Sequence, residues 1–199
     1  MNSVNIILRD FDGVLVGEDT IGVDRGAWIC VKQSIPMICA CGDFDSVTQT
    51  QHEHIKMLTK TYQLPKIKDI TDFEYALSLC KNYDHIYVYG AFGGRIDHLL
   101  VNIELLKRDA RIHFVSDSQE AYTLGVGRHT IAKDTKYVSF IAIEDSVISL
   151  DGFKYPLQKR SITPRDLYLT SNEVIHNDHV ITIHKGRVCV LCIYHETTK

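Results

Sequence analysis

The stretch GDFDS at residues 42–46 directly follows the apolar run PMICAC at residues 36–41. A short apolar run that ends at turn residues is typical of a buried strand. Two carboxylates, Asp43 and Asp45, therefore lie just past the carboxyl end of a predicted strand, where ligands gather in open parallel sheets. This position leaves two interpretations open, a polar turn that happens to be acidic or a metal site.

The same order of strand and helix extends outward from this junction. Apolar or β-rich runs at residues 4–8, 85–89 and 111–115 predict further strands, and the polar stretch 48–61 is compatible with a helix. Strands that alternate with helices indicate a parallel sheet with helices on its faces. We therefore expect a Rossmann-like α/β domain with a mainly parallel sheet over residues 1–118.

A capping signal marks the start of one helix. Thr71 is a favourable N-cap residue and Glu74 follows three residues later, which is the pattern of a capping box. Ala76 and Cys80 then fall on one helical face. The pattern places Asp72 in the first turn, where a carboxylate interacts favourably with the helix dipole.

The pattern changes after about Asp117. Short β-branched or aromatic runs separated by turn signals now follow one another, at residues 137–143, 146–150, 180–184 and 187–194. No helical periodicity of useful length appears among them. We therefore expect a C-terminal all-β domain, an antiparallel sandwich or a barrel-like fold, over residues 119–199. The predicted fold class is an α/β domain followed by a β-sandwich.

The composition argues against several classes of protein. The chain has 199 residues, of which 45% are hydrophobic, and a formal net charge of −3. A general nucleic-acid binder carries a basic surplus, so no nucleic-acid partner is expected. No apolar run approaches the roughly 20 residues that span a bilayer, and the N-terminus lacks the features of a signal peptide. We expect a cytoplasmic protein with no membrane partner.

The six cysteines are expected to be reduced core residues, because most lie within apolar runs. Cys189 and Cys192 form a CxxC pattern inside a predicted strand, where residues three apart face opposite sides. Structural zinc usually needs a turn at that point and a second ligand pair, and the sequence shows no second pair. Core packing is therefore favoured over metal binding for this pair.

Three acidic or glycine-rich segments each follow a predicted strand and are expected to converge on one edge of the sheet. Asp43, Asp45 and Asp72 would offer hard oxygen ligands to Mg²⁺, which prefers one or two carboxylates together with waters and phosphates. Glycines in the segment GAFGGR, residues 90–95, would let the backbone approach a phosphate, and Arg95 would pair with it. The combination predicts a nucleotide-phosphate site without a P-loop, since no GxxxxGK[ST] occurs.

Each of these signals has an ordinary structural explanation when it is taken alone. An isolated DxD is usually a solvated turn, and a pair of glycines after a strand is usually only a turn. Asp72 alone suits helix capping, and Arg95 with Asp97 would form a surface ion pair. Only the ordered combination of the signals favours a functional site.

In this order, the segments resemble the thiamine pyrophosphokinase family. The matching elements are VDRGA at 23–27, GDFDS at 42–46, KDITDFEYAL at 68–77, GAFGGRIDH at 90–98 with Asn102, GFKYPL at 152–157 and TSN at 170–172. They run from about Ile21 to the C-terminus, and the first twenty residues lack a clear counterpart. GDFDS and GGRxDH together are specific motifs, and the resemblance also implies an α/β domain followed by a β-sandwich.

The resemblance implies a reaction in which thiamine and ATP give thiamine diphosphate and AMP. The thiamine hydroxyl attacks the β-phosphorus and the whole pyrophosphoryl group moves, so positioning and electrostatic stabilisation dominate. A carboxylate near the hydroxyl would accept its proton, and the sequence does not indicate which one. The implied cofactor is Mg²⁺, ATP is the co-substrate, and the implied partners are thiamine and a second copy of the chain in a homodimer.

The resemblance also implies roles for individual residues. The metal ligands are Asp43, Asp45 and Asp72. The catalytic residues are these three together with Arg95 and Asp97. The residues that bind ATP or its phosphates are Asp24, Asp69, Gly93, Gly94, Arg95 and Asn102. Ser171 and Asn172 match the family's element that binds thiamine at the dimer interface.

Three residues need separate interpretation. Trp28 would either stack on the thiamine cation or pack in the core from its helix. Lys154 would either face the phosphates or cap a strand edge. Arg25 departs from the family, which often has glycine at this position, and the bulkier arginine is expected to affect only the fine geometry of the site.

Two other functions compete with this interpretation. The segment 5–15, with Asp10 and Asp12, resembles the nucleophile motif of haloacid-dehalogenase-type phosphatases, whose first aspartate is phosphorylated. Those enzymes need a downstream lysine and a late acidic pair in a suitable context, and they lack an all-β C-terminal domain of this kind, so we favour a turn at 11–13.

The second competing function is that of a nucleotide- or thiamine-binding regulatory protein that has lost the chemistry. The complete set of acidic residues with Arg95 argues against it.

Overall fold

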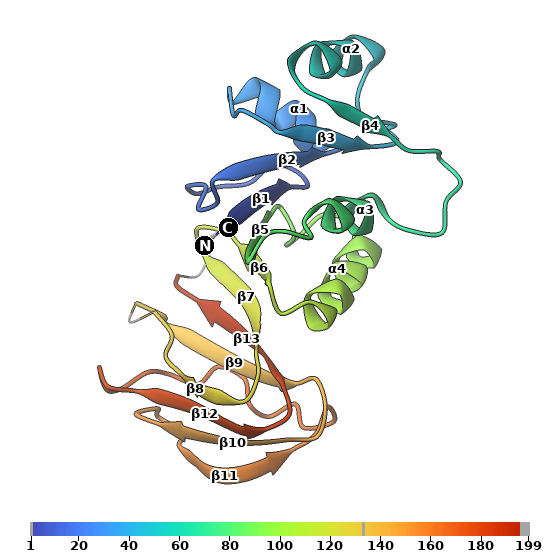
Figure 1. The fold of residues 1–199 in the computed structure, drawn as a ribbon. Helices are drawn as coiled ribbons and strands as arrows, with labels where there is room; N and C mark the ends of the chain where they lie inside the picture. Colours follow the sequence, from blue (N-terminus) through green and yellow to red (C-terminus); the bar gives the residue numbers. More distant parts are fainter. Residues whose placement is uncertain (1, 133, 196–199) are drawn as a thin grey trace. The chain divides into compact units, whose positions relative to one another are not determined.

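The chain divides into two units in the computed structural model, which describes residues 2–132 and 134–195 (Figure 1). The first unit comprises the chain up to Leu105 together with Arg111–Ser116. The second comprises Leu106–Ala110 and the chain from Asp117 onward. Each unit is built around hydrophobic clusters of its own, so each is described by itself.

Parallel strands form the sheet of the first unit. Their spatial order is β4 (Thr61–Gln63), β3 (Cys39–Gly42), β2 (Asp19–Val23), β1 (Ser3–Ile7), β5 (His85–Tyr89) and β6 (Ile112–Val115), with parallel pairing throughout. The chain adds β2 to β4 on one side of β1 and then β5 and β6 on the other. The carboxyl ends of all these strands therefore meet at one edge, with a change of direction beside β1 that favours a ligand crevice.

Helices cover both faces of this sheet (Figure 1). They are α1 (Arg25–Lys32), α2 (Gln49–Leu58), α3 (Asp72–Leu79) and α4 (Ile96–Arg108). Tyr89 of β5 packs with Cys30 of α1 in one cluster. Phe114 is paired in register with Val88, so its side chain points to the opposite face, where its ring centroid lies 6.4 Å from that of Phe73 in α3. Burial of both faces explains why several of these strands read as continuous apolar runs.

Two capping boxes begin the helices α2 and α3. The Thr71 hydroxyl accepts a hydrogen bond from the Glu74 backbone N–H, and the Glu74 carboxylate accepts one from the Thr71 N–H. Thr48 and Gln51 form the same reciprocal pair at the start of α2. The predicted helix start at Asp72 is confirmed, and so is a helix within the stretch 48–61.

Strands β2 and β4 are not anticipated by the apolar patterns. The sequence of β2 is DTIGV, in which only two residues are large and apolar, and the sequence of β4 is TYQ. Both strands are defined by pairing with neighbours rather than by their own composition, since β2 lies between β1 and β3. The C-terminal part of the stretch 48–61 therefore leaves the helix at Leu58 and enters β4 at Thr61.

The second unit contains two groups of antiparallel strands (Figure 1). One has the order β7 (Gln119–Leu124), β13 (Val188–Ile193) and β9 (Tyr137–Ala142). The other has the order β11 (Leu157–Ile162), β10 (Ser146–Asp151), β12 (Val180–Lys185) and β8 (Gly127–His129). One hydrophobic cluster receives side chains from both groups, among them Phe140 and Val190 from the first and Ile148 and Ile181 from the second. The arrangement is a β-sandwich, and this part of the prediction is confirmed.

The strands β7, β8 and β11 of this unit were not anticipated. The sequence of β11 is LQKRSI, in which the middle four residues are exposed and polar, and β8 has only three residues. Strands β8 and β11 lie at the two edges of their sheet, where one side of the strand faces solvent and polar residues are favoured, so their pattern resembles that of a loop.

The cysteines are buried as their apolar sequence surroundings predict. All six cysteines are buried, and Cys192 lies in the core of the sandwich, as predicted for core residues. Within the described residues, no helix is both long enough and apolar enough to cross a membrane.

Candidate active site

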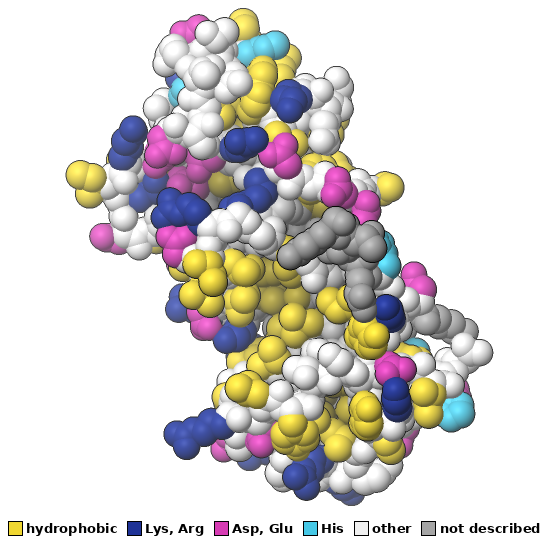
Figure 2. Space-filling view, turned by 180° about the vertical axis from the view of Figure 1, so that it is seen from behind, with side chains coloured by type: hydrophobic (Ala, Val, Ile, Leu, Met, Phe, Trp, Pro, Cys, Tyr) yellow, Lys and Arg dark blue, Asp and Glu magenta, His cyan; other side chains and the backbone are white. Residues whose placement is uncertain are grey.

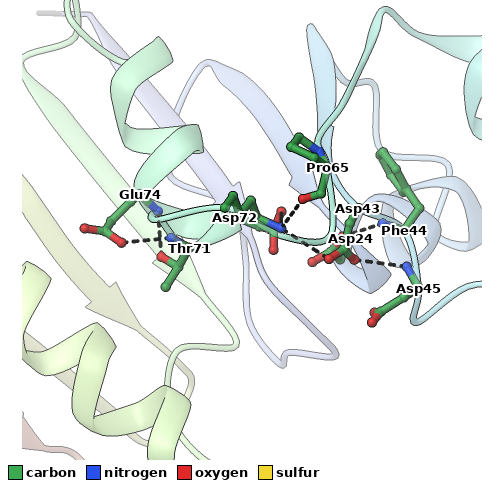
Figure 3. Close-up of polar contacts among 9 residues, drawn as sticks. Asp24, Asp43, Phe44, Asp45, Pro65, Thr71, Asp72 and Glu74 are labelled. Carbon is green, nitrogen blue, oxygen red and sulfur yellow. Dashed lines mark hydrogen bonds and ion pairs between the residues drawn. The ribbon is translucent and has the colours of Figure 1, made fainter.

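Three carboxylates converge at the carboxyl edge of the parallel sheet (Figure 3). Asp24 follows β2, Asp43 follows β3, and Asp72 is the first residue of α3. One ligand oxygen from each lies within 4.8 Å of the corresponding oxygens of the other two. We refer to Asp24, Asp43 and Asp72 as the carboxylate cluster.

A glycine makes room for one member of the cluster. The Oδ1 atom of Asp24 accepts a hydrogen bond of 2.9 Å from the backbone N–H of Phe44. Gly42 has φ of +141°, and a Cβ atom placed on it would lie 2.0 Å from that same Oδ1. Asp24 itself adopts φ of +48°, which is uncommon for a residue with a side chain. The local backbone is therefore built to bring the Asp24 carboxylate against the end of β3.

Phe44 anchors the turn that carries Asp43. Its side chain is only 4% exposed and stacks on His52 of α2 with ring centroids 4.3 Å apart. Its φ of +59° turns the chain sharply, and the backbone N–H of Asp45 donates to Asp43 Oδ1 over 3.2 Å. Phe44 lies between Asp43 and Asp45 in the sequence, and its buried ring anchors the turn that places Asp43 in the cluster. The exposed Asp45 carboxylate lies apart from the cluster (Figure 3).

The capping box of α3 positions Asp72. Because Thr71 and Glu74 fix the first turn, the Asp72 side chain leaves the helix start toward Asp43. Its Oδ1 atom is buried and lacks a well-aligned hydrogen bond among the described residues. The same atom lies 3.1 Å from the Lys68 ammonium, so charge attraction rather than an aligned hydrogen bond holds it. This oxygen has unused capacity as a ligand.

Lys68 lies among these carboxylates, and the sequence interpretation gave it no role. Its Nζ lies 3.2 Å from Asp43 Oδ2 and 3.1 Å from Asp72 Oδ1, and it also donates to the Pro65 carbonyl over 3.2 Å. Its side chain is only 13% exposed. The sequence does show Lys68 four residues before Asp72. Because Lys68 precedes the helix, this spacing does not indicate a helical ion pair.

The electrostatics of the cluster follow from burial and from these contacts. Burial, reinforced by the charges of Asp72, Asp43 and Asp45, raises the pKa of Asp24 to about 7, although the Phe44 N–H opposes the shift. Burial also acts to raise the pKa of Asp43, but hydrogen bonds from the Asp45 N–H and from Lys68 outweigh it and lower that pKa. Burial acts to lower the pKa of Lys68, and its contacts with Asp72 and Asp43 reverse that effect and raise it.

A cleft of about 430 Å³ opens beside the cluster. Its walls carry the acidic residues Asp24, Asp72 and Asp97 and the basic residues Arg9, Lys66 and Lys68. On the face seen in Figure 2, acidic and basic side chains likewise gather side by side on the first unit. A cleft of mixed charge suits a ligand in which anionic phosphates are combined with a cation.

The start of α4 lines this cleft through Asp97 and Asn102, whereas Gly93, Gly94 and Arg95 of the preceding glycine-rich loop are not among its wall residues. Gly93 and Gly94 both have positive φ, as the glycine pattern predicts for a tight approach. Arg95 and Asp97 form a two-point ion pair in which Nε donates to Oδ1 over 3.1 Å, and both side chains are exposed. The Arg95 guanidinium lowers the pKa of Asp97 to about 2. The buried Asn102 amide donates to the Ala91 carbonyl over 3.4 Å, which ties α4 to the loop.

Arg9 is a second cleft residue that the sequence interpretation missed. It follows β1 and donates from Nη1 to the Gly93 carbonyl over 3.1 Å. A Cβ atom on Gly94 would lie 1.2 Å from that Nη1, so the guanidinium occupies the space that the glycine leaves. Its Nε atom is buried and lacks a hydrogen-bond partner among the described residues. The available signal was an arginine directly after a strand, at the same edge as the acidic segments.

Asp69, Ser171 and Asn172 are not brought into this cleft. Asp69 is exposed and does not line its walls. In the second unit, Ser171 is exposed with φ of +55°, while Asn172 is 5% exposed. The Asn172 side chain accepts from the Tyr155 N–H and donates to the Tyr155 carbonyl, each over 3.0 Å. It therefore fixes the loop that presents Ser171, and its side-chain amide is already engaged at both ends.

The residues that the sequence left with two interpretations also have defined surroundings. Trp28 packs against the cluster of Ala27 and Phe44, which matches the core interpretation. Lys154 forms an ion pair of 2.6 Å with Glu173 in the second unit. Arg25 pairs with Asp10 over 3.1 Å, and both side chains are largely exposed.

The carboxylate cluster fits a magnesium ion. Carboxylate oxygens are the ligands that Mg²⁺ prefers, and it uses one or two of them together with waters and substrate phosphates. The under-used Oδ1 of Asp72 and the crowding of three carboxylates both favour a bound cation. The predicted ligands Asp43 and Asp72 are brought together by the fold, and Asp24 stands beside them where the sequence had placed Asp45.

Comparison with known proteins gives the same assignment for both units. The family model for the catalytic domain of thiamin pyrophosphokinase matches residues 18–115, and the model for its vitamin B1 binding domain matches residues 128–188. The curated thiamine pyrophosphokinase of Bacillus subtilis (strain 168) is 34% identical, with 83% of each chain covered.

Solved structures support this result. A crystal structure of thiamine pyrophosphokinase from Bacillus subtilis superposes with a TM-score of 0.84 at 30% identity, covering 98% of this chain and 100% of that one. A thiamin pyrophosphokinase from Geobacillus thermodenitrificans gives a TM-score of 0.79 at 28% identity, covering 98% and 99%. With matching models over both units and a curated relative at this identity, the chain belongs to the thiamine pyrophosphokinase family.

Proposed function

We propose that this chain transfers the pyrophosphoryl group of ATP to the hydroxyl of thiamine, giving thiamine diphosphate and AMP. One observation carries the proposal most directly. A carboxylate cluster and a glycine-rich loop lie at the same edge of the parallel sheet in a chain that belongs to this family. The phosphatase alternative has less support, because Asp10 is exposed and paired with Arg25 and stands outside the carboxylate cluster.

The metal of this reaction would be Mg²⁺, held by Asp43 and Asp72 with Asp24 beside them. Bound there, it would neutralise phosphate charge as the transition state develops. Asp45 stays a predicted ligand by family resemblance, although its carboxylate is exposed and apart from the cluster. Asp24 also remains a candidate for contact with the nucleotide.

The phosphates would lie along the basic side of the cleft. Gly93 allows close approach of the backbone, because a Cβ atom there would meet nothing within 4 Å, and Gly94 remains a predicted phosphate-binding residue beside the Arg9 guanidinium. Arg95 would stabilise transferring phosphoryl groups, with Asp97 orienting its guanidinium through the two-point ion pair. Asn102 would hold the glycine-rich loop in place, and Asp69 remains a predicted polar residue of the nucleotide site. Arg9 adds a cation that the family motifs do not include.

The transfer itself makes one bond and breaks one. The thiamine oxygen forms a bond to the β-phosphorus, and the bond from that phosphorus to the oxygen bridging to the α-phosphorus breaks, so AMP leaves. The hydroxyl proton passes to a carboxylate of the site. The remaining work is to hold the reacting atoms in line and to exclude competing water.

Thiamine would be bound by the second unit, with Ser171 at the binding loop and Asn172 shaping it. We propose a homodimer and a cytoplasmic location as well. The six buried cysteine thiols support a reducing compartment. Light scattering of the purified protein should give the mass of two chains, and a mass of one chain would contradict the dimer.

The function is tested with purified protein, thiamine, ATP and Mg²⁺. Thiamine diphosphate and AMP should appear in equal amounts, and both should disappear on chelation of the metal. The Asp43→Asn variant should lose the activity while the Asp10→Asn variant keeps it. Binding of ATP and thiamine without turnover would instead support the regulatory protein, and phosphate release that requires Asp10 would support the phosphatase.

A further inference from the structure

We propose that Lys68 is a built-in counter-cation of the metal site. In the metal-free protein its ammonium holds Asp43 and Asp72 together. When a divalent cation binds, the ammonium leaves the carboxylates and contacts the phosphates of the nucleotide. The inference rests on the proposed function in one respect, namely that the carboxylate cluster binds a metal–nucleotide complex.

The first support is the position of the ammonium. Nζ of Lys68 lies 3.2 Å from Asp43 Oδ2 and 3.1 Å from Asp72 Oδ1, so one charge bridges two carboxylates from different elements. The three side chains are between 13% and 20% exposed, which places the contact out of bulk water. Partly buried pairs of this kind are screened much less than surface pairs. The bridge is therefore a defined feature of the site rather than a chance contact of a surface lysine.

The second support is the competition for ligand atoms. A divalent cation that binds Asp43 and Asp72 needs oxygen lone pairs on the same two carboxylates that Lys68 now contacts. Asp72 Oδ1 has no aligned hydrogen bond to lose, so the change exchanges one charge contact for a stronger one. Retaining the ammonium beside the metal would add charge repulsion at short range. The two cations therefore exclude one another at this position.

The third support is the destination of the freed side chain. Lys68 lines the cleft together with Arg9 and Lys66, which are the basic residues of its wall. A lysine carries a compact charge on a flexible four-carbon stem, so its ammonium can move while its backbone stays in place. Lysine is also a common ligand for phosphate as a point charge. A short movement converts Lys68 from a partner of carboxylates into a partner of phosphate.

The test separates binding of the metal alone from binding of the metal with a nucleotide. Mn²⁺, followed by electron paramagnetic resonance, serves as the probe metal, and a non-hydrolysable ATP analogue serves as the nucleotide. In Lys68→Met, Mn²⁺ alone should bind at least about fivefold more tightly, as expected when one adjacent competing charge is removed. The Mn²⁺–nucleotide complex should bind about tenfold more weakly, because a phosphate contact is lost.

Two control variants sharpen the result. Lys81→Met removes the same charge at an exposed position away from the cleft, and both affinities should remain unchanged. Lys68→Arg keeps the charge, so its affinity for Mn²⁺ alone should stay close to that of the original chain. Thermal unfolding provides an independent readout. In the presence of a chelator, Lys68→Met should unfold at a lower temperature than the original chain. Addition of Mn²⁺ should raise the unfolding temperature of Lys68→Met by more than that of the original chain.

Opposite shifts of the two affinities support the proposal. The proposal is overturned if Lys68→Met binds Mn²⁺ alone no more tightly than the original chain does. It is also overturned if Lys68→Met binds the Mn²⁺–nucleotide complex with unchanged affinity. Formation of thiamine diphosphate by the original chain is measured as a separate test of the proposed function. If the two affinities shift as expected and no thiamine diphosphate forms, the proposed function fails while the role of Lys68 stands.

Discussion

The Oδ1 atom of Asp24 occupies the space that the missing side chain of Gly42 leaves open. A Cβ atom on Gly42 would lie 2.0 Å from that oxygen, and the φ of Gly42 is +141°. Gly42 ends β3 and Asp24 directly follows the neighbouring strand β2, so the end of β3 and the turn after β2 fit one another. The relationship explains why a carboxylate cluster forms at this point of the sheet.

Gly42→Ala should therefore displace the Asp24 carboxylate from the cluster. We expect the variant to bind Mn²⁺ at least about tenfold more weakly, a loss of about 1.4 kcal/mol. The strained backbone should also cost about 1–3 kcal/mol in free energy of unfolding. Metal titration and urea unfolding measure the two effects. Gly125→Ala is the control, since a Cβ there would meet nothing within 4 Å, and metal affinity equal in both variants would contradict the expectation.

The two capping boxes offer a matched pair of substitutions. Thr71→Ala and Thr48→Ala each remove an N-cap hydroxyl, so each should lower the free energy of unfolding by about 1 kcal/mol. Only Thr71 precedes a member of the carboxylate cluster, so only Thr71→Ala should also reduce the affinity for Mn²⁺ and the rate of thiamine diphosphate formation. Equal activity of the two variants under conditions in which both are fully folded would show that the helix cap does not position Asp72.

Substitutions of Asp43 and Asp45 are predicted to weaken metal binding to different extents, although the two residues belong to the same sequence motif. Asp43→Asn removes one of the carboxylates that would ligate the metal, so it should weaken Mn²⁺ binding by about 100-fold. Asp45→Asn changes an exposed side chain outside the cluster and should have a smaller effect on metal affinity. Equal losses in the two variants would favour the set Asp43, Asp45 and Asp72 that the family resemblance implies.

The stability of the metal-free protein should depend on the protonation of Asp24. Its pKa is raised from an ordinary 3.8 to about 7, so between these values the folded chain holds a proton that the unfolded chain has lost. Stability from this group is therefore present below about pH 4 and is lost as the pH rises through about 7. Asp24→Asn removes this dependence and should be more stable near pH 8 by on the order of a few kcal/mol.

Unfolding of both proteins in the presence of a chelator, at intervals from pH 4 to pH 8, measures this dependence. The difference in unfolding free energy between the variant and the original chain should grow over that range and level off above it. Parallel curves would show that Asp24 titrates normally.

Much of the fold follows from local sequence patterns. The run at residues 85–89 and the pair Thr71 and Glu74 predict their strand and helix start because apolar composition and capping act within a few residues. Strand β2 is missed because its sequence, DTIGV, owes its conformation to pairing with β1 and β3 on either side. Edge strands such as β11 are missed because their exposed residues resemble those of loops.

The site is predicted in outline, and its contacts are not. Motif order places Asp43, Asp72 and the glycine-rich loop at one edge of the sheet. The position of Asp24 in the cluster depends on a left-handed turn and on an absent Cβ, which no periodicity reveals. Lys68 and Arg9 are found only through side-chain contacts, since a basic residue in a loop is usually solvated.

The central claim is that this chain moves a pyrophosphoryl group in a single step. The most direct measurement is a turnover with ATP labelled in the α-phosphate in one sample and in the γ-phosphate in another, with thiamine and Mg²⁺ present. The γ-label should appear in thiamine diphosphate and the α-label in AMP, in equal amounts and without ADP. Label in thiamine monophosphate with formation of ADP, or no transfer to thiamine at all, would contradict the account.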